Sequence, residues 1–329
     1  MILNNYTKKR VLITGGLGMI GSSIARKLVE LGAVVTIADA KIKGFGANIF
    51  NIREIKDKVT VYEADIRDKK TMTPLVESCD IIFNLAGQVS HNDSIIDPFY
   101  DTELNYLGHM NILEIVKNVN RNIKLIYSGT RMQYGRVERI PVSEDYPLRP
   151  LSPYALNKTA AENLYLFYNR LYGIPVVIFR ITNPYGPGGQ VKHNNYNMVN
   201  WFTRLALEKK EITIYGNGSQ IRDYIYIEDL TDALVMAGID PENDGEVFNL
   251  GSGSGITFME MAETIVSVAG SGSIVQVPWP DDYINIETGD FVANIDKIKK
   301  AYSWAPRVPF RKGIELTCSH FRNYIEHYL

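Results

Sequence analysis

A tyrosine and a lysine four residues apart have the spacing of an acid–base pair. Tyr154 and Lys158 lie in Leu-Ser-Pro-Tyr-Ala-Leu-Asn-Lys, residues 151–158, where a helix would place both side chains on one face. A free tyrosine titrates near pH 10, and a positive charge within about 4 to 6 Å favours the phenolate and lowers that pKa. The pair therefore predicts a phenol that exchanges a proton with a substrate hydroxyl. With 20 tyrosines in the chain, about one such spacing is also expected by chance, so the neighbouring motifs decide.

A glycine-rich turn near the N-terminus predicts a dinucleotide site. An apolar strand at 9–14 runs into Gly-Gly-Leu-Gly-Met-Ile-Gly at 15–21, and a helix is predicted at 19–31. Glycines at this spacing allow a tight turn, a close approach of the backbone to a pyrophosphate, and close packing of the helix on the sheet. The helix start would offer free amides and its positive dipole end to the phosphates. The residues expected to contact the cofactor here are Gly15, Gly18, Met19, Ile20 and Gly21.

Asp39 predicts which dinucleotide is bound. It ends the next apolar strand, 34–38, about 20 residues beyond the turn, where a carboxylate can accept hydrogen bonds from a ribose diol. The same carboxylate would repel a 2′-phosphate. NAD is therefore expected as the cofactor, in preference to NADP.

Length and composition describe a globular chain and argue against several classes of protein. The 329 residues are 45% hydrophobic, and 35 basic against 37 acidic residues leave a formal charge of −2. This balance favours neither nucleic acid nor a membrane surface as a partner. Because no apolar run is long enough to span a membrane and no leader-like segment is visible, a cytoplasmic location is expected. Cys79 and Cys318 are far apart in sequence, which predicts buried thiols, with no disulfide framework and no metal site.

Alternating apolar segments and helical patterns predict an α/β fold, a doubly wound parallel sheet of the Rossmann type. Further strands are expected at 59–63, 80–85, 123–127 and 175–181, and helices at 101–118 and 153–172. Ser152 and Gly173 are suited to cap the second of these helices. Such a sheet binds ligands at the carboxyl ends of its strands, which is where the motifs fall.

Beyond residue 182 the pattern predicts a smaller, mixed α/β lobe that binds the substrate. A breaker-rich turn is followed by elements expected at 198–209, 212–215, 247–250, 257–269 and after 311. The domains are thus expected at 1–182, binding the nucleotide, and at 183–329, mainly binding the substrate. The chain is expected to cross back to the first domain at least once.

Six motifs together resemble the extended short-chain dehydrogenase/reductases, in particular the nucleotide-sugar epimerase/dehydratase family. They are Thr-Gly-Gly-Leu-Gly-Met-Ile-Gly at 14–21, Ala-Asp-Ile-Arg-Asp at 64–68, Asn-Leu-Ala-Gly-Gln at 84–88, Tyr-x-x-x-Lys at 154–158, Asn-Pro-Tyr-Gly-Pro at 183–187 and Arg-Asp-Tyr at 222–224. The resemblance runs over nearly the whole chain and is strongest to the UDP-glucose 4-epimerase and CDP-tyvelose 2-epimerase branches. It implies an NAD-dependent enzyme of carbohydrate metabolism, for example in polysaccharide biosynthesis, with a nucleotide-diphosphate sugar as substrate.

The resemblance implies catalytic roles for three residues. Tyr154 would take a proton from a sugar hydroxyl while hydride passes to the nicotinamide, and Lys158 would hold the ribose and lower the phenol's pKa. Thr130 matches the position of the usual catalytic serine and keeps its hydroxyl, although a threonine at a strand end can also be structural.

Residues 130–135 bear on which reaction follows. The family's 4,6-dehydratases resemble Thr-Asp-Glu-Val-Tyr-Gly here, whereas this chain has Thr-Arg-Met-Gln-Tyr-Gly. Arginine and methionine do neither acid nor base work at neutral pH. Epimerisation through transient oxidation needs neither, which favours an epimerase acting at C4. A 2-epimerase, a net NAD(P)-dependent dehydrogenase or reductase, a 4,6-dehydratase and a non-catalytic NAD sensor remain as alternatives.

Further contacts are implied by the resemblance alone. Asn183 and Arg222 are expected on the substrate diphosphate, although the first could be a turn residue and the second a surface ion pair. Asn105 is expected to tie the active-site strands together, or to lie on a helix surface. The acidic stretch at 281–285 replaces a further phosphate-binding arginine that family members often carry. The other expected cofactor contacts are Asp65, Ile66, Leu85, Ala86, Gly87, Asn105 and Ser128, together with Tyr154 and Lys158. A homodimer through the helices at 101–118 and 153–172 is also expected.

Overall fold

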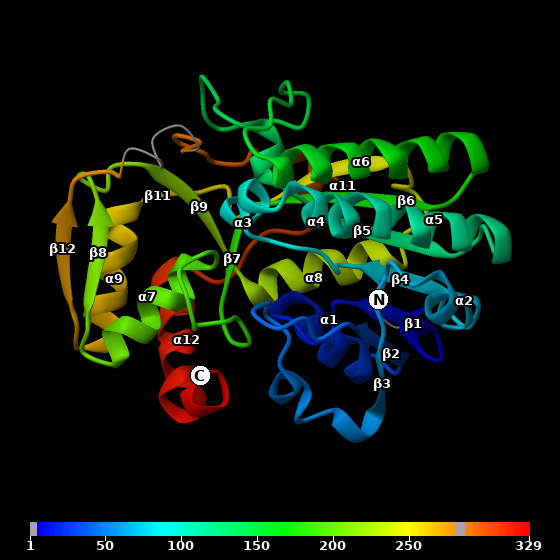
Figure 1. Cartoon of the computed structure of the whole chain (residues 1–329), viewed down its shortest axis with the longest axis horizontal. Coiled ribbons are helices and arrows are strands. Elements are labelled where there is room, and N and C mark those ends of the chain that lie inside the picture. Colours follow the sequence, from blue (N-terminus) through cyan, green and yellow to red (C-terminus); the bar gives the residue numbers. More distant parts are fainter. Residues whose placement is uncertain (1–4, 281–286) are drawn as a thin grey trace.

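A seven-stranded parallel sheet forms the centre of the molecule, with helices on both faces (Figure 1). The computed structural model describes residues 5–280 and 287–329. The strand order is β10-β6-β5-β4-β1-β2-β3, so the direction of winding reverses between β1 and β4. The strands are β1 (Arg10–Thr14), β2 (Val34–Asp39), β3 (Val59–Glu63), β4 (Ile81–Asn84), β5 (Lys124–Thr130), β6 (Val176–Ile181) and β10 (Glu246–Leu250). The predicted Rossmann-type α/β fold is confirmed.

Two helical layers bury the two faces of this sheet, and alternate strand residues supply each core. Along β1, Leu12 packs with side chains of α5 and α6, whereas Val11 and Ile13 pack with those of α1 and α8. One layer comprises α2 (Lys69–Glu77), α3 (His91–Ile96), α4 (Pro98–Thr102), α5 (Gly108–Val119) and α6 (Pro153–Tyr172). The other comprises α1 (Met19–Glu30), α8 (Ile227–Gly238) and α11 (Asp296–Tyr302).

The helix α6 has the bounds and the caps that its sequence predicts. The Ser152 hydroxyl accepts a hydrogen bond from the Ala155 amide at 3.3 Å, and Gly173 ends the helix in the left-handed region at φ 69°. Tyr154 and Lys158 therefore lie in its first two turns.

The continuous helix predicted at 101–118 is wrong in its detail. The chain forms α4, then a π-helical turn at Glu103–Leu107, and then α5. Within the π turn, the buried Asn105 side chain donates to the Gln88 carbonyl at 3.0 Å and to Asp101 at 2.9 Å. Helical periodicity in the sequence does not reveal an inserted residue of this kind, which often marks functional positions.

In residues 183–280 and 287–329, two small sheets and three helices form the second lobe. A parallel pair joins β12 to β8, and a three-stranded sheet has the order β11-β9-β7. The strands are β7 (Asn183–Tyr185), β8 (Glu211–Tyr215), β9 (Ile221–Tyr226), β11 (Gly255–Thr257) and β12 (Ser273–Val277). The helices are α7 (Met198–Leu207), α9 (Phe258–Ala269) and α12 (Phe310–Tyr324).

One strand that the sequence placed in the second lobe belongs to the central sheet. The segment predicted at 247–250 forms β10, which pairs with β6 in parallel from Glu246 to Leu250. Local sequence pattern cannot reveal which sheet a short apolar strand joins, because that depends on long-range pairing. The domain boundary between residues 182 and 183 stays a prediction.

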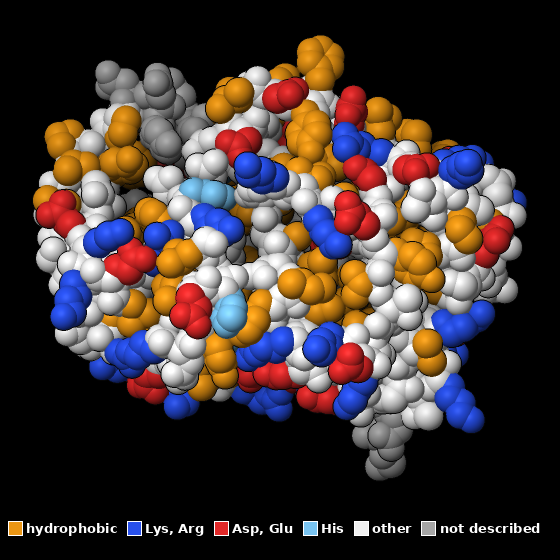
Figure 2. Space-filling model, turned by 60° about the horizontal axis from the view of Figure 1, so that its bottom comes forward, with side chains coloured by type: hydrophobic (Ala, Val, Ile, Leu, Met, Phe, Trp, Pro, Cys, Tyr) orange, Lys and Arg blue, Asp and Glu red, His pale blue; other side chains and the backbone are white. Residues whose placement is uncertain are grey.

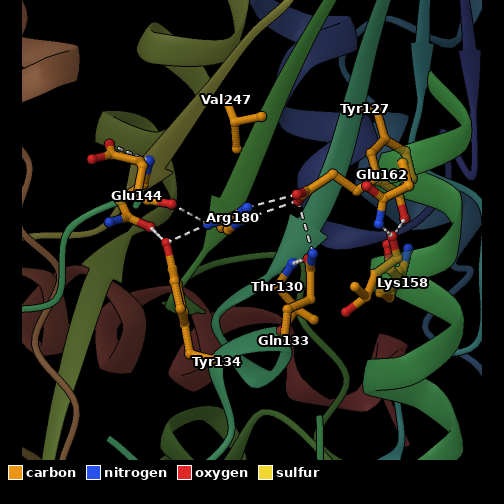
Figure 3. A network of polar contacts seen from close by, with 12 residues as sticks. Tyr127, Thr130, Gln133, Tyr134, Glu144, Lys158, Glu162, Arg180 and Val247 are labelled. Carbon is orange, nitrogen blue, oxygen red and sulfur yellow. Dashed lines mark hydrogen bonds and ion pairs between the residues drawn. The ribbon is translucent and has the colours of Figure 1, made fainter. Parts of the chain in front are cut away.

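A buried ion pair joins α6 to the sheet (Figure 3). The Glu162 carboxylate on α6 accepts two hydrogen bonds from Arg180 on β6, at 2.6 and 3.0 Å. Gln133 donates to the same carboxylate at 2.8 Å and accepts the Thr130 amide at 2.8 Å. Arg180 also donates to the Tyr134 hydroxyl at 2.8 Å. The helix α6, the strand β6 and the turn after β5 are therefore held in one arrangement.

Glu162→Gln should destabilise the protein strongly, because it leaves the Arg180 guanidinium buried without its counter-ion. The expected loss is about 3 to 5 kcal/mol in the free energy of unfolding, measured by urea titration. Glu315→Gln is the control, since it breaks an exposed pair with Lys312 and should cost less than about 1 kcal/mol. Similar losses in the two variants would contradict the structural weight given to the buried pair.

Candidate active site

A cavity of about 840 Å³ lies where the carboxyl ends of the sheet strands meet the second lobe. The face drawn in Figure 2 is hollowed between the two lobes, with basic and acidic side chains mixed around the hollow. The cavity is lined by nearly all of the residues that the sequence singled out: Gly15, Gly18, Met19, Ile20, Gly21, Asp39, Asp65, Ile66, Leu85, Ala86, Gly87, Ser128, Thr130, Tyr154, Lys158, Asn183 and Arg222. The structure thus brings together motifs that are up to about 200 residues apart in the chain.

The glycine-rich turn has the geometry that a pyrophosphate needs. Gly15 adopts φ 65°, which costs glycine little. A Cβ on Gly21 would lie 2.5 Å from the Gly15 carbonyl oxygen, so only glycine allows α1 to begin this close to the turn. Gly18 occupies the N-cap and contributes no side-chain hydrogen bond to the first amides of α1. A helix start of this kind is suited to an anion.

Asp39 lies at the end of β2 with its carboxylate on the cavity wall. Its two oxygens accept the Leu17 amide at 3.0 Å and the Lys41 amide at 2.9 Å. Burial raises the pKa of Asp39 above its usual value, while these two backbone hydrogen bonds lower it. Each carboxylate oxygen keeps a lone pair for a ribose hydroxyl. The turn, the helix start and this carboxylate together fit NAD.

The remaining cofactor candidates border the same side of the cavity. Asp65 is held by Arg67 through an ion pair of 2.7 Å; although burial raises the pKa of Asp65, the hydrogen bonds and charge of Arg67 lower it below its usual value. The amides of Leu85 and Ala86 donate to the Thr14 hydroxyl at 3.1 and 3.2 Å. This hydroxyl joins β1 to the end of β4.

Asn105 lies behind the cavity wall and is absent from its lining. Its side chain is fully buried, so the alternative of a helix-surface residue is wrong. Its Oδ1 is buried without a hydrogen-bond partner among the described residues, and a Cβ on Gly87 would lie 2.5 Å from it. Gly87 thus lets the π turn approach the loop after β4.

The Thr130 hydroxyl lies close enough to the Tyr154 phenol to lower its pKa. Thr130 ends β5 and is nine-tenths buried. Burial raises the pKa of Tyr154 to about 12, while the Thr130 hydroxyl and the charge of Arg131 lower it. The two hydroxyl groups therefore form one polar centre on an otherwise enclosed wall.

Lys158 lies in the second turn of α6 and lines the cavity together with Tyr154, and its expected lowering of the Tyr154 pKa stays a prediction. The Lys158 ammonium donates to the Ser128 carbonyl at 3.1 Å and lies 5.2 Å from the centre of the Tyr127 ring. Burial lowers the pKa of Lys158 to about 8, while the charge of Asp101 raises it. Four-residue spacing correctly places both residues on one helix face, and burial is the largest influence on the pKa of the phenol.

The candidates for the substrate diphosphate lie on neighbouring strands of the second lobe. Asn183 on β7 is paired with Tyr224 on β9, and its amide donates to the Asp223 carbonyl at 2.8 Å. Arg222 is only 7% exposed, so the reading as a surface ion pair is wrong. Its guanidinium donates to the Gly289 carbonyl at 2.6 Å and forms an ion pair with Glu287. The acidic stretch at 281–285 lies outside the described residues.

Sequence reasoning missed several cavity residues. Arg131, Met132 and His91 line the cavity beside Thr130, yet the first two were considered only as missing acids and bases. Arg131 and Met132 directly follow Thr130 in the sequence, and that position was the signal that could have identified these two residues. The loop after β7 lines the cavity through Gln190 and residues 194–197, none of which the sequence singled out.

Two further searches cover the described ranges. Within residues 5–280 and 287–329, no three His, Cys, Asp or Glu side chains are arranged to hold a metal ion. In the same ranges, no helix has the length and apolar character needed to cross a membrane. Cys79 and Cys318 are free and buried, as expected.

Comparisons with known proteins agree with this geometry. Residues 11–251 match the model of the NAD dependent epimerase/dehydratase family. The chain is 32% identical to a putative UDP-glucose 4-epimerase of Methanocaldococcus jannaschii over 95% of its own length and 98% of that protein. It is 33% identical to a UDP-N-acetyl-alpha-D-glucosaminuronate decarboxylase of Bacillus cytotoxicus, over 96% and 98%.

Among solved structures, an epimerase of Methanothermobacter thermautotrophicus superposes with a TM-score of 0.92 at 29% identity, covering 99% of this chain and 95% of that one. The names of these relatives thus include more than one reaction type. On the match of sequence, fold and cavity, the chain belongs to the NAD-dependent epimerase/dehydratase family.

Proposed function

We propose that the protein is an NAD-dependent epimerase of a nucleotide-diphosphate sugar and acts at C4. One observation carries the choice within the family. The wall beside the Tyr154–Thr130 centre presents Arg131 and Met132, and neither side chain can serve as acid or base at neutral pH. Epimerisation suits this wall, because only one proton and one hydride leave the sugar and return to it. Elimination of water needs a further acid and a further base, which Arg131 and Met132 do not provide.

The chain's own residues account for the proton transfer. With a pKa of about 12, the Tyr154 phenol is protonated at neutral pH and needs added positive charge to act as a base. The Thr130 hydroxyl lowers the pKa of the phenol and so favours the phenolate. When bound, NAD supplies a positively charged ring that accepts a hydride from the sugar carbon and returns it. The enclosed wall excludes water from the keto sugar while it is turned or presented again.

A net dehydrogenase or reductase is the principal alternative, because it would use the same three residues. The two activities differ in the fate of the cofactor. An epimerase retains near-stoichiometric NAD, which denaturation of the purified protein releases. It also forms new epimers from a panel of UDP-, GDP-, CDP- and dTDP-sugars without added NAD, as followed by NMR. Turnover that requires added NAD and accumulates NADH would favour the alternative.

Tyr154→Phe should lower the rate of epimer formation by at least about 100-fold, because it removes the proposed base. The amount of NAD released on denaturation should not change, since the phenol is not part of the nucleotide turn. Tyr172→Phe, near the other end of α6, is the matched control and should retain full activity. Undiminished turnover in Tyr154→Phe would remove the proposed base.

We also propose that the protein forms a homodimer through the helical layer that contains α5 and α6, which lie side by side in Figure 1. Leu156, Phe167 and Leu171 share one face of α6 and are 57%, 46% and 57% exposed. On α4, Phe99 is 83% exposed. Unpartnered apolar side chains on adjacent helices are the usual sign of an interface.

Replacing Leu156 and Phe167 with glutamate should halve the mass measured by light scattering after size-exclusion chromatography. Buried carboxylates would destabilise a helix-to-helix contact, whereas the isolated subunit should keep its helical circular dichroism. Ile49→Glu, at an exposed apolar site of another segment, should leave the mass unchanged. A wild-type protein that is already monomeric at micromolar concentration would refute the proposal.

A further inference from the structure

Arg131 is a buried cation with little compensation inside the protein. It directly follows Thr130, lines the cavity, and is only 8% exposed. Its Nη1 donates to the Thr288 hydroxyl at 2.9 Å, and its guanidinium lies 5.6 Å from the centre of the Phe291 ring. Among the described residues, no carboxylate lies within ion-pair distance of it. A guanidinium has five N–H donors, so most of its binding capacity is left for another partner.

The surroundings add positive charge to this part of the cavity. Burial and the neighbouring charge of Arg222 lower the pKa of Arg131 to about 9, while Glu287 and Asp223 raise it. Glu287 is already in an ion pair with Arg222. The Asp223 carboxylate accepts hydrogen bonds from the amides of Ser252, Gly253 and Ala293. A buried charge that lacks a counter-ion is unfavourable until an anion arrives.

His91 provides a second unsatisfied group near the same place. Its Nδ1 is buried without a hydrogen-bond partner among the described residues, and the side chain lines the cavity. Burial and the charge of Arg131 lower its pKa, which keeps the imidazole neutral at physiological pH. Cationic and neutral polar groups therefore converge beside the Tyr154–Thr130 centre.

The positions of the two arginines separate their tasks. Arg222 comes from β9, whose neighbour β7 carries Asn183, so the two diphosphate candidates belong to one small sheet. Arg131 instead directly follows Thr130, and both line the cavity together with the Tyr154 phenol. An anion at Arg131 is consequently an anion close to the reacting part of the sugar.

We propose that Arg131 binds a carboxylate carried by the sugar, so that the preferred substrates are nucleotide-diphosphate sugar acids of the hexuronate type. This inference rests on the proposed action on nucleotide sugars and adds the class of sugar. Arginine suits the role because its planar fork can engage both carboxylate oxygens. The bond is made in a buried site, where it discriminates strongly against a sugar with a neutral substituent.

Binding of matched ligands to the NAD-loaded protein tests the proposal. UDP, dTDP, CDP and GDP are titrated by calorimetry, and the tightest binder defines the base. The glucose and glucuronate derivatives of that base, which differ only at C6, are then compared. Wild-type protein should bind the glucuronate about 30-fold or more tightly than the glucose derivative. Equal affinities would overturn the proposal.

Variants distinguish a sugar carboxylate from the diphosphate as the partner of Arg131. Arg131→Gln should abolish the preference for the glucuronate, whereas Arg222→Gln should weaken both sugars and the bare nucleoside diphosphate while keeping the preference. Thr288→Val keeps the guanidinium and should also keep the preference. If Arg131→Gln weakens the bare nucleoside diphosphate as much as the glucuronate, Arg131 contacts the diphosphate and the proposal is wrong.

Two further readouts keep the outcome interpretable. If thermal unfolding shows that Arg131→Gln is not folded, Arg131→Lys replaces it; a point charge without the fork should lower the preference by about threefold to tenfold, and an unchanged preference would count against the proposal. Turnover is scored separately. Selective binding of the glucuronate without formation of any epimer would refute the proposed reaction but not the role of Arg131. Epimerisation without a preference for the glucuronate would refute the role of Arg131 but not the proposed reaction.

Discussion

The attachment of α6 to the central sheet is the constraint on which the candidate site depends. The helix supplies Tyr154 and Lys158, while Thr130 comes from β5, and neither element alone forms the polar centre. The buried Glu162–Arg180 pair holds the helix against β6. The Gln133 side chain donates to the same Glu162 carboxylate and accepts a hydrogen bond from the Thr130 amide, which fixes the end of β5 relative to the helix. In Figure 3 these contacts run as one chain from the helix to the turn after β5. A shift of α6 would therefore move the Tyr154 phenol away from the Thr130 hydroxyl.

Burial is the second constraint on the site, because it favours the neutral form of the phenol, the ammonium and the guanidinium alike. It raises the pKa of Tyr154 to about 12, lowers that of Lys158 to about 8 and lowers that of Arg131 to about 9. In each case the neutral form gains at the expense of the charged form. The phosphates of a bound dinucleotide or nucleotide sugar are negative, and they would favour the charged forms of Lys158 and Arg131.

Much of the first lobe was predictable because its signals are local. The strand at 59–63 and the helix at 153–172 have the expected bounds, since apolar periodicity, Ser152 and Gly173 mark them in the sequence. The glycine-rich turn was equally readable, because Gly15 and Gly21 are required by backbone conformation and by close approach. Long-range features were not readable. The strand β10 was assigned to the wrong lobe, and the π turn around Asn105 was not foreseen.

The amino-acid sequence by itself determined the fold class, the NAD-binding turn with Asp39, and the residue types of the catalytic centre, because each depends on neighbours in the chain. Tertiary structure decided the electrostatic state of that centre. Only the folded molecule shows that Lys158 turns toward the Ser128 carbonyl and that the Tyr154 phenol is too buried to ionise easily. Likewise, only the fold places Arg131 in the cavity wall, with no carboxylate of the described residues within ion-pair distance. Spacing along a helix sets which side chains share a face, but solvation depends on every segment that closes over them.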